Sequence, residues 1–212
     1  MMQRRTLAAW MLATSAMWMA GPVGAQAAVE TPDALVKRLS ADVLETIKAD
    51  PELRNGNIAR ISQLVDTVVM PHVNFRKMTS AAVGPMWRQA TPEQRERLQQ
   101  EFKNMLIRTY AGALKQVSDE RVEVKPLRAA PGDTDVLVRT EVIGKGEPVQ
   151  LDFRVEKGDG KGWKIYNMNV LGVWMVETYR TQFAQELNKG GIDGLIQALA
   201  NRTMAVEAKN AK

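Results

Sequence analysis

The stretch that decides the fold is Val149-Gln150-Leu151-Asp152-Phe153-Arg154-Val155-Glu156, in which apolar and polar side chains alternate strictly. Successive side chains of a β-strand point to opposite faces, so this pattern predicts a strand with one apolar and one polar face. Residues 122–125 and 136–142 show the same alternation. Gly158-Asp159-Gly160 predicts a hairpin loop leading into a fourth strand, from Trp163 to about Val170. We therefore expect an antiparallel sheet of about four strands whose outer face meets water.

Helical periodicity flanks this sheet on both sides. Apolar residues recur every three or four positions over four stretches, and a further short helix is expected over 193–200. These four stretches are 35–47, 58–69, 98–117 and 173–187. Thr91-Pro92-Glu93-Gln94 predicts a capping box at the start of the third helix, and Thr79 or Ser80 opens a short helical turn before it. Helices that cover one apolar face of an antiparallel sheet make a two-layer α+β fold.

The first residues have the pattern of a secretory signal peptide. Arg4-Arg5 precede an uncharged apolar stretch from Leu7 to Ala20, and Ala25-Gln26-Ala27 is a small-x-small cleavage site. The apolar stretch is shorter than the roughly 20 residues that a membrane span requires. We expect residues 1–27 to be removed on export to the periplasm. A single domain over residues 28–205 and a polar tail over residues 206–212 are expected to follow.

Composition excludes several classes of site. The sequence has no cysteine, which rules out disulfides and thiolate metal sites. Cleavage near Ala27 removes Arg4 and Arg5 and no acid, so the formal net charge falls from +5 to +3. The basic side chains of the third helix alternate with acids and indicate a solvated face rather than a nucleic-acid site. They are Arg95, Arg97, Lys103 and Arg108.

The sequence contains no catalytic motif. It has no G-x-S-x-G elbow, no H-E-x-x-H and no P-loop. Its single histidine, His72, follows a helix end at Pro71, which favours a local hydrogen bond over a catalytic role. We predict a non-enzymatic protein without cofactor or metal. Two alternatives stay open: a small-cavity enzyme that uses His72 with a carboxylate such as Asp66, and a periplasmic adaptor or chaperone with an apolar groove for peptide.

An ordered set of segments resembles the MlaC family of periplasmic phospholipid-binding proteins, also known as toluene-tolerance proteins. No single segment is a catalytic signature, but together they span nearly all of the chain after the signal peptide. The segments are Val69-Met70-Pro71-His72-Val73-Asn74-Phe75-Arg76-Lys77-Met78, Phe102-Lys103-Asn104-Met105-Leu106-Ile107-Arg108-Thr109-Tyr110, Trp163-Lys164-Ile165-Tyr166, Tyr179-Arg180-Thr181-Gln182-Phe183 and Gly191-Ile192-Asp193-Gly194-Leu195.

The resemblance implies a monomeric carrier that shuttles phospholipid across the periplasm. Its expected partners are an outer-membrane lipoprotein complex and an inner-membrane ABC transporter with an MCE-domain subunit, and its expected role is to maintain lipid asymmetry of the outer membrane. The family usually has an acid where this chain has Leu171 and a small polar residue where it has Trp174. These departures suggest a different lipid preference or partner contact at the cavity mouth.

The implied carrier has its acyl chains inside an apolar cavity on the order of 1,000 Å³, with the headgroup largely outside. We expect the lining to come from one helix before the sheet, from the inward face of the sheet and from the last helix. The candidates are Met78, Leu106, Tyr110, Val138, Leu151, Phe153, Val173, Trp174, Tyr179 and Phe183. Arg76, Lys77 and Arg180 are candidates for contact with the headgroup.

Overall fold

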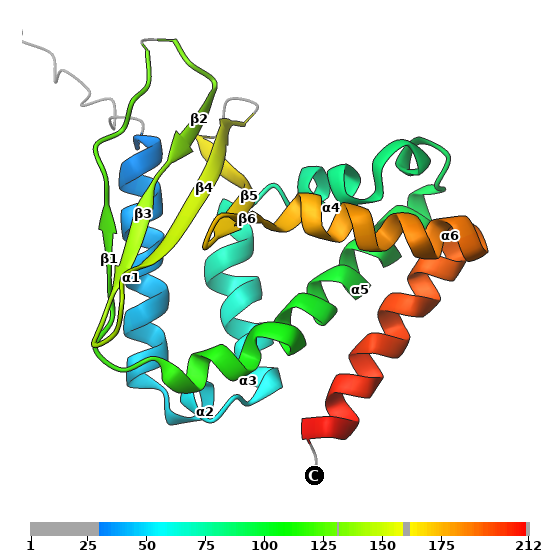
Figure 1. The fold of residues 1–212 in the computed structure, drawn as a ribbon, viewed down its shortest axis with the longest axis horizontal. Coiled ribbons are helices and arrows are strands. Elements are labelled where there is room, and N and C mark those ends of the chain that lie inside the picture. The colour runs from blue at the N-terminus through cyan, green and yellow to red at the C-terminus, as the bar shows by residue number, and fades with distance from the viewer. Residues whose placement is uncertain (1–29, 131, 159–161, 211–212) are drawn as a thin grey trace, which may run out of the picture.

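The computed structural model describes residues 30–130, 132–158 and 162–210. The predicted signal peptide, including the cleavage site near Ala27, lies outside these ranges. A twisted sheet with the N-terminal helices against it forms one half of the molecule, and a group of helices that includes the last one forms the other (Figure 1). Within the described ranges, no helix combines the length and apolarity needed to cross a membrane.

The sheet is antiparallel and has six strands, which confirms the predicted α+β class but exceeds the expected four strands. Its order is β1-β3-β4-β5-β6, with β2 also paired to β4. The strands are β1 (Arg121–Val124), β2 (Asp135–Val138), β3 (Thr140–Ile143), β4 (Val149–Lys157), β5 (Trp163–Val170) and β6 (Val173–Trp174).

The expected strand over 136–142 is divided at Arg139. The backbone N–H of Thr140 donates to the carboxylate of Asp152 at 3.1 Å, and the Thr140 hydroxyl donates to the carbonyl of Leu151. Side chains therefore replace part of the regular ladder at this point. Because Thr140 and Asp152 are both buried, these hydrogen bonds satisfy polar groups that would otherwise be costly.

A tight turn after β5 corrects the predicted start of the last helix. Leu171 and Gly172 have φ values of 52° and 85°, and Val170 pairs with Val173 across the turn. Two consecutive positive φ values match the twist of a two-residue hairpin. Val173 and Trp174 are therefore strand residues, whereas their helical spacing predicted that they begin the last helix.

The helices agree closely with the expected stretches. The α-helices are α1 (Pro32–Ala49), α2 (Pro51–Arg54), α3 (Ile58–Leu64), α4 (Phe75–Val83), α5 (Pro92–Tyr110) and α6 (Met175–Asn210). The remaining segments are a π-helix, η1 (Val65–Val69), and three 3-10 helices, η2 (Met70–His72), η3 (Gly84–Arg88) and η4 (Ala111–Gln116).

The helix ends show which sequence signals were decisive. The capping box at Thr91 is present in full. The helix α4 is longer than the short turn predicted from Thr79 or Ser80, because Asn74 caps it and accepts a hydrogen bond from Lys77 N–H at 3.0 Å. The helix α6 kinks at Gly190-Gly191 and continues to Asn210, beyond the expected end near residue 200.

Three apolar clusters hold these elements together. The first joins α4, α5 and α6 around Phe102, and the second joins α1 to the inner face of the sheet around Val138 and Val155. The third lies where α1, α2, α3 and the end of α5 meet, around Ile47 and Leu53. An internal space remains between the sheet, α1, α3 and α5.

Candidate functional site

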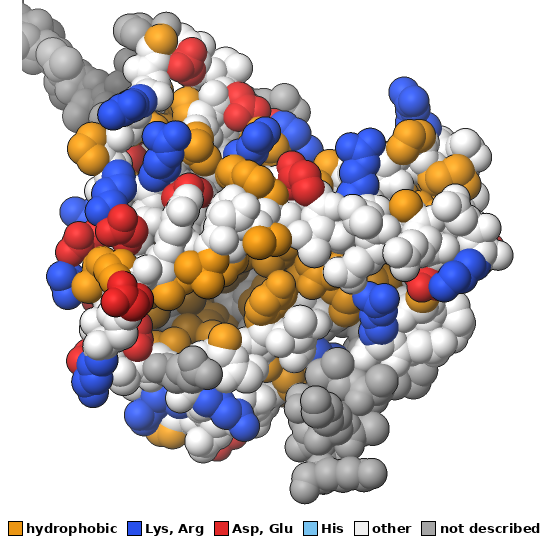
Figure 2. All heavy atoms as spheres, viewed as in Figure 1, with side chains coloured by type: hydrophobic (Ala, Val, Ile, Leu, Met, Phe, Trp, Pro, Cys, Tyr) orange, Lys and Arg blue, Asp and Glu red, His pale blue; other side chains and the backbone are white. Residues whose placement is uncertain are grey.

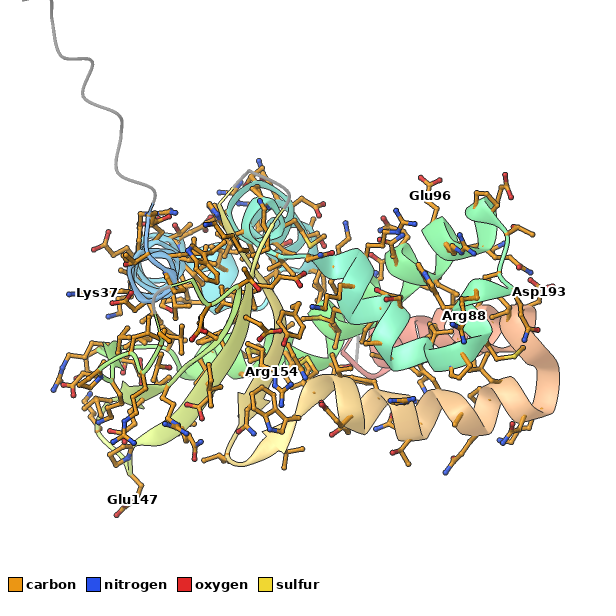
Figure 3. All side chains as sticks on the ribbon, turned by 90° about the horizontal axis from the view of Figure 1, so that it is seen from above. Lys37, Arg88, Glu96, Glu147, Arg154 and Asp193 are labelled. Carbon is orange, nitrogen blue, oxygen red and sulfur yellow. The ribbon has the colours of Figure 1, made fainter. Side chains whose placement is uncertain are left out.

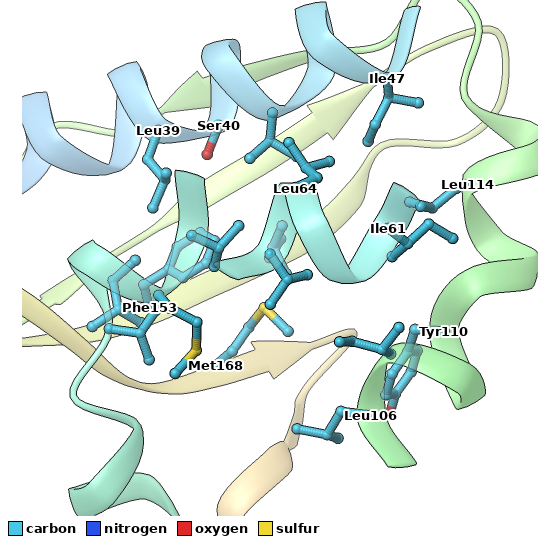
Figure 4. Close-up of a pocket in the computed structure, with 18 of the residues that line it drawn as sticks. Leu39, Ser40, Ile47, Ile61, Leu64, Leu106, Tyr110, Leu114, Phe153 and Met168 are labelled. Carbon is cyan, nitrogen blue, oxygen red and sulfur yellow. The ribbon is translucent and has the colours of Figure 1, made fainter. Parts of the chain in front are cut away.

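This internal space is an apolar cavity of about 440 Å³. Its volume lies in the ordinary range for ligand sites, below the order of 1,000 Å³ that we expected. Leu39, Leu64 and Leu106 line it from three different helices (Figure 4). Figure 2 shows apolar side chains lining a hollow that opens on the face seen there.

One wall of the cavity comes from α1, α3 and the π-helix η1. Their apolar positions share a face because they recur at helical spacing, and that face is turned toward the sheet and α5. The main contributors are Val36, Leu39, Val43, Leu44, Ile47, Ile61, Leu64, Val65 and Val69. The polar atoms on this wall come from Ser40, whose hydroxyl is visible beside Leu39 in Figure 4.

A second wall is one face of α5. Lys103, Leu106, Ile107 and Tyr110 lie at intervals of three and four residues and all line the cavity. Tyr110 is 46% exposed and lies at the edge of the cavity. Its hydroxyl also interacts with that of Tyr179; burial and this hydrogen bond raise the pKa of Tyr179.

The third wall is the inner face of the sheet. Phe153 of β4 lies directly opposite Met168 of β5 in the ladder, and both side chains reach the cavity (Figure 4). Leu151 and Ile165 extend this surface along the two strands. The strict alternation that predicted the sheet therefore also supplies this wall.

Lys103 carries the charge on this otherwise apolar lining. Its side chain is 16% exposed, and its Nζ lies 2.6 Å from a carboxylate oxygen of Asp66 in η1. Asp66 is 51% exposed. The sequence predicted Lys103 on the solvated face of its helix because the residue is charged, although it lies three residues before Leu106.

Comparison with known proteins shows the family of this chain. The family model described as MlaC protein matches residues 37–201. The chain belongs to the MlaC family. It is 27% identical over 169 residues to the intermembrane phospholipid transport system binding protein MlaC of Haemophilus influenzae, covering 78% of this chain and 79% of that protein. It is 26% identical over 167 residues to toluene tolerance protein ttg2D of Pseudomonas putida, covering 78% and 77% respectively.

A solved structure similar to this chain carries a ligand. The phospholipid-binding protein from Ralstonia solanacearum, in complex with a phospholipid, is 50% identical to this chain and superposes with a TM-score of 0.79. The match covers 85% of this chain and 98% of that one. The α+β fold and the family predicted from the ordered sequence segments are thus confirmed.

Within this MlaC-family cavity, the structure places four of the ten predicted lining residues on the wall: Leu106, Tyr110, Leu151 and Phe153. Val138 belongs instead to the buried cluster between α1 and the sheet, where it is 1% exposed. It occupies the correct face of the sheet but packs against helix side chains before reaching the cavity.

Met78, Tyr179 and Phe183 lie in the helical core, away from the predicted position on the cavity wall. The ring of Phe102 is 5.0 Å from that of Tyr179 and 5.1 Å from that of Phe183, both edge-on. The first turn of the last helix adjoins β5 and β6, and the rest of the helix packs against α4 and α5. Its apolar stripe is therefore core.

Val173 and Trp174 also fall outside the wall, because the turn at Leu171-Gly172 makes them a strand. Val173 is 58% exposed. The ring of Trp174 packs under the guanidinium of Arg154, 4.9 Å from its centre, on the outer face of the sheet (Arg154 is labelled in Figure 3).

The three predicted headgroup residues do not line the cavity either. Lys77 pairs with Glu156 and lies over the ring of Tyr166, 3.7 Å from its centre. Arg180 lies beside Gly84, and Arg76 is exposed. The start of α4 is held on the outer side of the sheet by Asn74, which donates to Glu156 at 2.8 Å.

The structure does not assemble the alternative catalytic pair. Asp66 bonds Lys103, whereas the charged neighbours of His72 are Arg38, Lys164, Glu30 and Asp42. Burial, followed by the charges of Arg38 and Lys164, lowers the pKa of His72 below its ordinary value of 6.5. Among the described residues, no group of three or more His, Asp or Glu side chains is placed to hold a metal ion.

Proposed function

We propose that this protein is a periplasmic, non-enzymatic carrier that binds phospholipid in the cavity between the sheet, α1, α3 and α5. The observation that carries the proposal is an apolar cavity of about 440 Å³ in an MlaC-family chain. A relative 50% identical to this chain was solved in complex with a phospholipid. The family members of known name serve intermembrane phospholipid transport and toluene tolerance.

An apolar cavity meets the main physical requirement of lipid transfer. At about 0.8 kcal/mol per CH₂, two acyl chains with ~30 methylenes cost roughly 24 kcal/mol to expose to water. Because the cavity wall is about as apolar as the bilayer interior, the free energy of the lipid is similar in the protein and in the membrane. Transfer between the two therefore stays near equilibrium. Contacts with partners can then set the direction.

The size of the cavity bears on how the lipid is held. A volume of about 440 Å³ is well below the order of 1,000 Å³ expected for two full chains. Under this proposal, the cavity has to widen to hold both acyl chains in full. The headgroup stays largely outside.

The proposed partners follow from the family. The carrier receives lipid from, or delivers it to, an outer-membrane lipoprotein complex and an inner-membrane ABC transporter with an MCE-domain subunit. This exchange would maintain the lipid asymmetry of the outer membrane. The predicted removal of residues 1–27 is part of the same proposal, because a shuttle has to be released from the membrane.

Native mass spectrometry of the purified protein, followed by organic extraction and identification of the lipid, tests the proposal. We expect a stoichiometric phospholipid. A protein that purifies bare and takes up no lipid from phospholipid vesicles would refute it. Such a result would favour an adaptor that binds peptide in the same space.

A further inference from the structure

Lys103 is the charged residue on the cavity wall among the described lining residues, and its position is unusual. A Lys side chain that lines an apolar cavity and is 16% exposed has lost much of its hydration. Its partner, Asp66, is 51% exposed. An ion pair with so exposed a partner contributes little to stability, whereas desolvation of the ammonium is unfavourable. Packing alone would favour Leu or Met at this position.

The location of Lys103 suits a ligand with one charged end. Lys103 lies about one helical turn from Leu106 and about two turns from Tyr110, on the same face of α5. An ammonium has three N–H donors, and the bond to Asp66 uses one of them. Anionic oxygens are strong acceptors for the others, and phosphate oxygens form short, charge-assisted bonds with Lys.

We propose that Lys103 binds the phosphate of the lipid and so distinguishes phospholipids from neutral lipids with the same acyl chains. This inference rests on the proposed function. Asp66 holds the ammonium at the wall and competes with the phosphate for it. Leu106 and Ile107 then contact the acyl chains beyond the phosphate. The lipid is oriented by one charged contact on a lining whose other described residues are uncharged.

The competition with Asp66 predicts that a change at Asp66 has the opposite effect on phosphate binding from a change at Lys103. Replacing Asp66 by Asn removes the competing negative charge but keeps an acceptor of similar size. Phosphate binding by Lys103 should then become stronger. A purely structural ion pair predicts a different outcome: Asp66→Asn would leave the lipid preference unchanged.

The test measures preference between two lipids with identical acyl chains, phosphatidylcholine and diacylglycerol. Delipidated full-length mature protein is incubated with mixed vesicles of the two, and the bound fraction of each is read by native mass spectrometry. We expect Lys103→Met to lower the preference for phosphatidylcholine by about tenfold or more, since bonds to charged groups are the strong ones. Lys103→Arg should retain it, and Asp66→Asn should increase it.

Lys115→Met is the matched control, because Lys115 is exposed on η4 and does not line the cavity. Unchanged preference in Lys103→Met, with both lipids still bound, would overturn the inference. Lys103→Gln repeats the measurement if the Met variant does not fold. A wild-type protein that binds neither lipid would refute the proposed function itself, which is a separate result.

Free inorganic phosphate is the other ligand that could offer phosphate oxygens to Lys103. We expect millimolar inorganic phosphate not to displace lipid from the wild-type protein, because a free anion makes no apolar contacts. Displacement by inorganic phosphate that disappears in Lys103→Met would identify a site for a free anion and overturn the assignment to lipid.

Discussion

Phe153 and Met168 face each other across the β4–β5 ladder, and both side chains enter the same cavity. A charge at either position would therefore lie on the apolar wall. We expect Phe153→Glu to abolish co-purification of lipid and to lower the free energy of unfolding by about 3–5 kcal/mol, because the packing of the ring is lost and the carboxylate is buried without a partner. Native mass spectrometry and thermal unfolding measure the two effects.

Val149→Glu is the control for this variant. Val149 lies in the same strand, is 36% exposed and does not line the cavity, so the same charge is added outside the site. It should retain lipid at the wild-type level. Equal amounts of lipid in Phe153→Glu and wild type would contradict the assignment of this wall.

Phe183 separates the helical core from the cavity. It is 1% exposed and packs edge-on against Phe102. We expect Phe183→Leu to reduce the free energy of unfolding by about 1–2 kcal/mol through lost packing, with no change in the amount of bound lipid. Denaturant unfolding and lipid extraction from one preparation provide the measurement. Loss of lipid from a fully folded variant would restore Phe183 to the cavity wall.

Asn74 caps α4 and also ties that helix to the sheet. Its carboxamide accepts from Lys77 N–H and donates to Glu156. We expect Asn74→Ala to lower stability by about 2 kcal/mol, compared with about 1 kcal/mol for Thr91→Ala, whose hydroxyl only caps α5. Chemical denaturation of both variants checks the order. A smaller effect at Asn74 than at Thr91 would show that the bond to Glu156 contributes nothing.

Leu171 adopts a left-handed backbone conformation, with φ of 52°, although its side chain is 66% exposed. This conformation costs a residue with a branched side chain about 1 kcal/mol. We expect Leu171→Asn to raise stability by about that amount, because Asn followed by Gly is favoured in this type of hairpin. Leu171→Ala keeps the unfavourable backbone and should give no gain. If both variants were as stable as wild type, the proposed backbone strain at Leu171 would be wrong.

His72 should make stability depend on pH below about pH 6.5. Its pKa in the folded protein is lowered by burial and by Arg38 and Lys164, so the unfolded chain binds the proton first as pH falls. Stability is then lost as pH drops below 6.5 and stops changing below the lowered folded pKa. His72→Gln should remove this slope and leave lipid binding intact. Urea unfolding at several pH values tests it.

Local patterns predicted most of the fold. The alternation over 149–156 identified the sheet, and Thr91 identified the start of α5. The break at Arg139 was not predictable, because it depends on the side chain of Asp152 from another strand. The hairpin at Leu171 was missed because Leu is a poor residue for positive φ, so the sequence carried no turn signal beyond one Gly.

The site was harder to predict than the fold. Leu39 and Ile61 belong to ordinary amphipathic stripes, and periodicity cannot distinguish a stripe that packs from one that borders a cavity. Phe183 has the same periodicity and is core. The spacing of Lys103 from Leu106 and Tyr110 indicated that it shares their helix face. Its charge nevertheless favoured a solvated position, so the sequence did not identify it as a lining residue.

The cavity wall combines Val36 from the first helix with Met175 from the start of the last, so its two sides are separated by most of the described chain. Contacts between such distant residues form late in folding, because the entropy of closing the loop between them has to be overcome first. A partly folded chain therefore has no binding site. Ligand can then bind only the completed domain, and every bound molecule shifts the folding equilibrium toward the native state.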